Sequence, residues 1–141
     1  MKRFLAVLLL IVLPMCCFTL SACDNKYSSR YNATSMSKSV GFDFSSASYQ
    51  LTFGKFNGVL SFKLTNKSGS EATLFYSITL GDGSAKVYYD YADEKVELID
   101  LSSQKVADSQ LAKIPARAKV YIIIESDGDC FNGKFYFDMQ W

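Results

Sequence analysis

The chain has 141 residues, of which 49% are hydrophobic and 15% aromatic, and it carries 15 Lys and Arg against 14 Asp and Glu. This near-neutral balance, without a basic block, argues against a nucleic-acid partner. The sequence contains no histidine, which excludes Ser-His-Asp and Cys-His catalysis and removes the commonest zinc ligand.

The first 22 residues are typical of an export signal. Lys2 and Arg3 form a short basic start, and residues 4–20 form an apolar run interrupted by Pro14. A membrane-spanning helix needs about 20 apolar residues, so this run is short and broken for a stable span. A basic start, an apolar middle and small residues at the end predict a helical signal peptide that is removed from the mature protein.

This segment ends in Leu20-Ser21-Ala22-Cys23, which resembles the lipobox of bacterial lipoproteins. The resemblance implies that the Cys23 thiol receives a diacylglyceryl group and that a peptidase cuts before it. The mature chain would then be exported and anchored to the bacterial membrane through Cys23. Asp24 resembles the inner-membrane retention signal of enteric-type bacteria. The alternative is an uncleaved anchor helix that ends by chance in a cysteine.

Cleavage before Cys23 would leave 119 of the 141 residues, which is enough for one domain. The stretch 24–39, DNKYSSRYNATSMSKS, holds five serines and few apolar residues, a composition typical of a flexible tether. The predicted organisation is a signal peptide over 1–22, a lipidated N-terminus with a Ser-rich tether over 23–39, and one β domain over 40–141.

From Val40 onward apolar and polar residues alternate, which predicts half-buried strands. The expected strands cover 48–53, 59–65, 72–80, 86–91, 95–101, 117–125 and 134–141. Residues rich in Gly, Asn, Asp and Ser predict turns at 54–58, 66–70, 81–84 and 126–133. The stretch 105–113 fits either a short strand or one helical turn.

About eight or nine short strands without a credible long helix predict an all-β fold, either an antiparallel β-sandwich or a barrel. The segments AKVYYDYADEKVELID, AKIPARAKVYIIIESD and FNGKFYFDM resemble the closing strands of small jelly-roll modules in bacterial surface proteins. This resemblance favours a jelly-roll-like sandwich.

Three tyrosines are the candidate ligand-binding residues. In a strand, Tyr89 and Tyr91 share one face and Tyr88 lies on the other, so at least one ring is expected to face solvent. An exposed ring can stack on a sugar, and the jelly-roll resemblance implies carbohydrate binding. The alternative is that tyrosine simply suits half-buried strands.

The acidic residues have two interpretations. Asp127-Gly128-Asp129, with Glu125 and Asn132 nearby, is rich in the oxygen ligands that calcium prefers. The twelve-residue calcium-loop pattern is absent, and such residues also form turns, as does Asp82 in GDGS. We therefore predict no metal site and no cofactor.

Paired carboxylates, Asp90 with Asp93 or Asp127 with Asp129, could serve glycoside hydrolysis. Carboxylates in turns are ordinary, however, and the domain is small for a substrate cleft, so we expect no enzyme and no catalytic residue. Cys130 has no partner once Cys23 is acylated, and it is expected to be a half-buried small residue.

The predicted function is a membrane-anchored lipoprotein that presents a non-catalytic binding or interaction module. Its expected partners are the membrane, through Cys23, and either an envelope carbohydrate or an envelope protein. A carbohydrate-binding module and a small glycan-active enzyme remain as alternatives.

Overall fold

The computed structural model describes residues 26–141, with the side chains of residues 110–112 left out. The predicted signal peptide, Cys23 and Asp24 lie outside the described residues. Within them all regular structure is β, and no helix is long and apolar enough to cross a membrane. The strands are β1 (Arg30–Thr34), β2 (Ser37–Phe42), β3 (Ser46–Thr65), β4 (Ala72–Thr79), β5 (Lys86–Tyr91), β6 (Glu94–Asp100), β7 (Val106–Ile114) and β8 (Lys119–Gln140).

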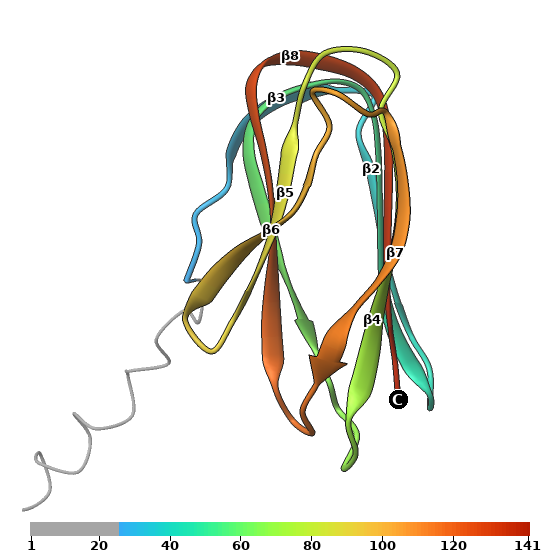
Figure 1. The fold of residues 1–141 in the computed structure, drawn as a ribbon. Coiled ribbons are helices and arrows are strands. Elements are labelled where there is room, and N and C mark those ends of the chain that lie inside the picture. The colour runs from blue at the N-terminus through green and yellow to red at the C-terminus, as the bar shows by residue number, and fades with distance from the viewer. Residues whose placement is uncertain (1–25) are drawn as a thin grey trace, which may run out of the picture.

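Two long strands, β3 and β8, form the centre of the molecule. They pair antiparallel from Ser46↔Gln140 to Thr65↔Lys119, and both bend midway, so that each contributes to two layers (Figure 1). In one layer β2 and β4 flank this pair and β7 adds to β4. In the other layer β5 pairs with β8 and β6 with β5, while β1 pairs with β3 near its bend. The predicted all-β fold, an antiparallel β-sandwich, is confirmed.

The two layers enclose one apolar core. Alternate residues of the strands point inward, as the alternation of apolar and polar residues predicted. The side chains of Phe56, Phe135 and Phe137 are at most 1% exposed. The ring of Tyr49 stacks on that of Phe62 with 3.6 Å between ring centres. Because the described chain holds no disulfide, burial of these apolar side chains is the main stabilising term.

Two predicted turns are instead parts of continuous strands. Residues 54–58 lie within β3 and residues 126–133 lie within β8, where both strands bend. The register shifts between Phe56 and Gly58, which marks a β-bulge. Gly58 has a φ of +114° and Asn132 a φ of +54°. Glycine and asparagine tolerate positive φ in a bulge as well as in a turn, so their presence did not distinguish the two.

The prediction that residues 24–39 form a flexible tether is also largely wrong. Residues 30–34 and 37–42 form β1 and β2, which pair with β3, so the ordered domain begins well before Val40. Both strands look polar because most of their side chains are exposed, and backbone pairing needs no apolar side chain. The ambiguous stretch near residue 105 forms a strand, β7.

We predict that Gly58→Ala destabilises the fold by about 1–3 kcal/mol because an alanine is strained at positive φ. A Cβ at this position would also lie 2.9 Å from the Tyr31 Cα and closer still to the Arg30 carbonyl oxygen. The measurement is the midpoint of urea unfolding. Gly69→Ala is the control, since a Cβ there meets nothing within 4 Å; equal midpoints for the two variants would contradict the docking of β1.

Candidate functional site

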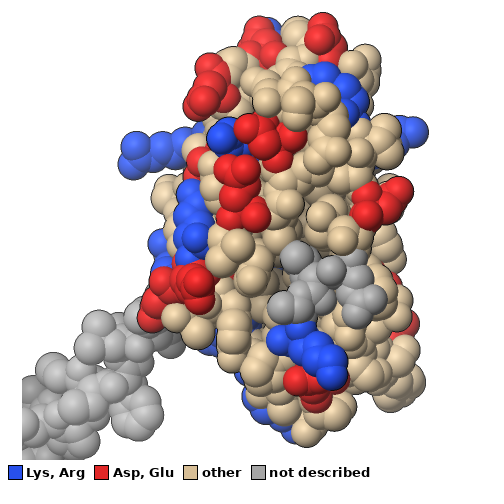
Figure 2. All heavy atoms as spheres, viewed as in Figure 1, with Lys and Arg blue, Asp and Glu red and all other residues tan. Residues whose placement is uncertain are grey.

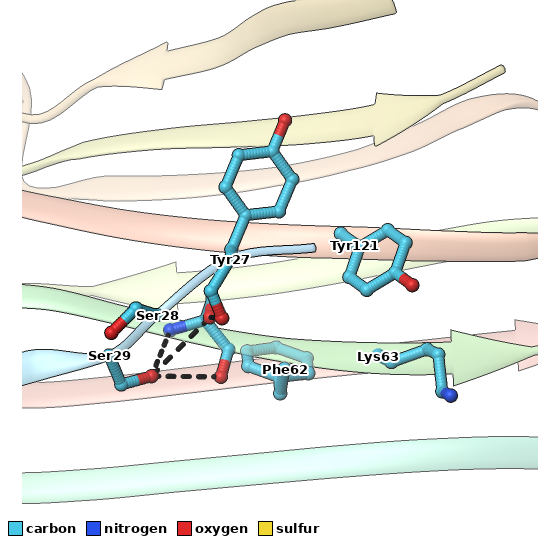
Figure 3. A pocket seen from close by; sticks show the side chains of 7 residues that line it. Tyr27, Ser28, Ser29, Phe62, Lys63 and Tyr121 are labelled. Carbon is cyan, nitrogen blue, oxygen red and sulfur yellow. Dashed lines mark hydrogen bonds between the residues drawn. The ribbon is translucent and has the colours of Figure 1, made fainter. Parts of the chain in front are cut away.

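The segment Lys26–Ser29, here called the strap, lies on the outer face of the layer that contains β5. Ser61 of β3 holds it through three hydrogen bonds. The Ser29 Oγ donates to the Ser61 carbonyl at 3.2 Å and accepts from the Ser61 N–H at 2.9 Å, and the Ser61 Oγ donates to the Tyr27 carbonyl at 3.1 Å. Figure 3 shows the hydrogen bonds of the Ser29 hydroxyl beside the Tyr27 and Tyr121 rings. The strap is thus a bound part of the sandwich.

The strap packs an aromatic ring next to an apolar spot on this outer face. Ile122 and Ile124 face the core, so Ile123 faces outward, yet it is only 1% exposed. Its neighbour Tyr121 meets the Tyr27 ring edge-on, with 5.7 Å between ring centres. Such edge-to-face contacts contribute about 0.5–1.5 kcal/mol beyond area burial.

An ion cluster fixes the N-terminal end of the strap. The Asp90 side chain is only 3% exposed, and it accepts hydrogen bonds from the Lys26 ammonium at 2.7 Å and from the Tyr27 hydroxyl. Lys26 also pairs with Asp93 at 2.7 Å. Burial alone would raise the pKa of Asp90, but the bonds from Lys26 and Tyr27 outweigh it and hold that pKa below its ordinary value. A buried carboxylate of this kind depends on its cation.

A cleft of about 310 Å³ opens beside the strap. Its walls combine aromatic rings, serine hydroxyls and one lysine. The residues that line it are Tyr27, Ser28, Ser29, Ser61, Phe62, Lys63 and Tyr121. Rings beside hydroxyls suit a small polar ligand with one flat apolar face, such as a sugar ring.

The three predicted tyrosines of β5 do not form one platform. Tyr89 and Tyr91 are half-buried and pack against the core. Tyr88 lies on the opposite side of the strand, where the Lys95 ammonium sits 4.0 Å from its ring centre. That contact is a cation–π interaction, so the ring that does not face the core already has a neighbour on one face.

Three of the acidic residues considered in the sequence analysis, Asp90, Asp93 and Asp129, contact lysines. Asp90 and Asp93 share Lys26. Asp129 pairs with Lys55 at 2.6 Å and accepts from Asn57, and these bonds keep its pKa below the ordinary value.

Two further acidic residues near these loops also have protein contacts. Glu125 pairs with Lys95 at 2.7 Å, and the Asp82 carboxylate accepts from the Gly83 N–H. Over residues 26–141 no cluster of three or more His, Cys, Asp or Glu has metal-binding geometry.

Cys130 is fully buried rather than half-buried. Its thiol donates to the Phe56 carbonyl at 3.3 Å, and burial raises its pKa. It therefore behaves as a small core residue with little thiolate character.

Comparison with known proteins finds no matching family model and no matching curated protein. Among solved structures, CapF in complex with 3-isopropenyl-tropolone is 14% identical with a TM-score of 0.35, over 85% of this chain and 32% of CapF. The Cnp3 cupin domain of Schizosaccharomyces pombe is 13% identical with a TM-score of 0.36, over 77% of this chain and 63% of that domain's chain. The GH115 4-O-methyl-alpha-glucuronidase BtGH115A is 11% identical with a TM-score of 0.34, over 78% of this chain and 18% of the glucuronidase chain. The chain spans less than two thirds of each, and at these TM-scores the similarity carries no functional inference.

We predict that Lys26→Met lowers the midpoint of urea unfolding, because Asp90 then stays buried without its cation. Adding Asp90→Asn should restore part of the loss, since no charge remains buried. Lys113→Met is the matched control, because it breaks an exposed ion pair with Glu71. A loss in Lys26→Met no larger than that of the control, or no recovery in the double variant, would contradict the role of this cluster.

The same cluster predicts a pH dependence. The pKa of Asp90 is lower in the folded chain than the ordinary 3.8, so its contribution is complete above that value and is lost as the pH falls through the lowered one. Wild-type stability should therefore fall more steeply below about pH 4 than that of Asp90→Asn, as urea midpoints measured from pH 7 to pH 2 would show.

Proposed function

We propose that the chain is a bacterial lipoprotein, anchored through Cys23, whose β-sandwich is a non-catalytic interaction module held at the membrane surface. Two observations support this proposal. The sequence Leu20-Ser21-Ala22-Cys23 has the order of a lipobox, and the strap begins at Lys26, three residues after the cysteine.

The strap makes the connection to the anchor short. Three residue steps separate Cys23 from Lys26, a span of about 11 Å at most in a fully extended chain. A free 16-residue tether would have spanned about 20–24 Å as a coil. The bound strap thus supports a domain that sits against the membrane.

The contacts of the acidic residues support a non-catalytic module. A carboxylate pair for glycoside hydrolysis needs one protonated and one free carboxyl group. Asp90 and Asp93 both bind Lys26, and Asp129 binds Lys55. These bonds hold the pKa of Asp90 and of Asp129 below the ordinary value, so neither group is suited to act as the protonated acid.

The strap cleft favours saccharide binding as a second candidate function. The Tyr27 and Tyr121 rings stand beside serine hydroxyls in a space of about 310 Å³. Aromatic rings stack on the apolar faces of sugars, and hydroxyls complement their rims. We therefore propose the cleft, rather than the tyrosines of β5, as the site of saccharide binding.

For the anchor, we predict that Cys23→Ala yields an unprocessed precursor that incorporates no labelled fatty acid, because only the thiol can form the thioether. Cys130→Ala serves as the control and should be processed and labelled like the wild type, since Cys130 lies in the core. The measurement is metabolic labelling with gel mobility; normal processing and labelling of Cys23→Ala would reject the anchor.

For the cleft, we predict that Tyr121→Ala abolishes binding to an array of bacterial envelope glycans, whereas Tyr121→Phe retains it, because stacking needs the ring. Tyr136→Ala is the control, since Tyr136 is 42% exposed outside the cleft lining. Absence of glycan binding by the wild type would remove the second function.

A further inference from the structure

One end of the sandwich displays an aromatic patch made of Phe42, Phe44, Lys67 and Trp141. Phe44 is fully exposed and Phe42 is 56% exposed. Together with Asp43 and Ser68 these residues line an open hollow of about 570 Å³. Single exposed apolar residues are ordinary, but a cluster of aromatic rings indicates an interaction surface.

Hydrogen bonds within and around the β2–β3 turn hold the patch in place. The Asp43 carboxylate accepts from the backbone N–H groups of Ser45 at 2.7 Å and Ser46 at 2.6 Å, an Asx-type turn. The Trp141 indole N–H donates to the Phe44 carbonyl at 3.0 Å. The Lys67 ammonium lies 4.1 Å from the centre of the Phe42 ring. The aromatic rings are therefore presented by a fixed backbone.

Traced back toward its N-terminus, the strap runs along β3 in the direction of this end. Arg30 pairs with Val59 and Ser29 bonds to Ser61, so the chain before Arg30 follows β3 toward Thr65. Beyond Thr65 come Asn66 and then Lys67, a member of the patch. Figure 1 shows the C-terminus and the β2–β3 turn at this lower end.

The charge of this end suits an anionic surface. The Arg117 guanidinium donates to the Lys67 carbonyl at 2.7 Å, which places two cations together. The hollow contains one side-chain carboxylate, Asp43, which accepts hydrogen bonds from Ser45 and Ser46 and keeps its negative charge, so Lys67 and Arg117 outnumber it. Most acidic side chains visible in Figure 2 lie above this end.

We propose that the aromatic patch is a membrane contact that enters the headgroup region of the bilayer beside the lipid anchor. This inference rests on the proposed lipoprotein function. Aromatic side chains concentrate at membrane interfaces, and Lys and Arg near the surface are attracted to anionic lipids. Phe44 and Phe42 lie at the depth of the acyl boundary, and Lys67 lies among the phosphates. Together with the anchor, this contact fixes the orientation of the domain relative to the membrane plane.

Trp141 is the only tryptophan of the chain and serves as the probe. The full-length lipidated protein is reconstituted in phosphatidylglycerol-containing vesicles with and without brominated acyl chains. We expect the brominated lipid to quench Trp141 emission, and Phe42→Ser/Phe44→Ser to lose most of that quenching. Val106→Ser is the control, because Val106 is 60% exposed on β7, outside the patch, and its quenching should equal that of the wild type.

Two outcomes would overturn the membrane contact. One is a lipidated wild type whose Trp141 is not quenched, and the other is quenching that survives unchanged in Phe42→Ser/Phe44→Ser. Fatty-acid labelling of Cys23 is scored separately on the same preparations, so failure of the anchor is distinguished from failure of the patch.

Discussion

The antiparallel pairing of β3 with β8 is the contact on which the rest of the structure depends. β1 and β2 pair with β3, β4 and β5 pair with β8, and β6 and β7 attach through β5 and β4. Because both long strands bend, one strand pair supplies the centre of two layers, and the core is the space enclosed between its halves. A break at the bulge beside Gly58 would therefore disturb both layers at once.

The strap adds a second, electrostatic constraint to this framework. A carboxylate near the end of β5 is buried where a lysine and a tyrosine from the N-terminal segment bind it. The first described residue, Lys26, is thereby linked to a paired strand of the sandwich rather than to a loose end. The strap and the turn that carries the aromatic patch are thus both fixed to the same sandwich by hydrogen bonds of their own.

The sequence predicted the parts of the fold that depend on a buried face. Strands β4 and β5 appeared close to their expected places because alternation records which side packs inward. Edge strands β1 and β2 were missed because backbone pairing leaves no apolar pattern, and the bends of β3 and β8 were mistaken for turns because bulges use the same residues. The ion pair between Lys26 and Asp90 joins residues 64 positions apart, a separation over which no local pattern carries information.

The place of β8 in the chain has a consequence for biogenesis. β8 is the last of the eight strands, yet it is central to both layers and pairs with β3, β4 and β5. Neither layer can close until the ribosome has made β8, and long-range pairings of this kind form slowly. The segment that carries β1 to β7 therefore stays without its central partner strand during synthesis, so folding of this domain begins only once β8 is available.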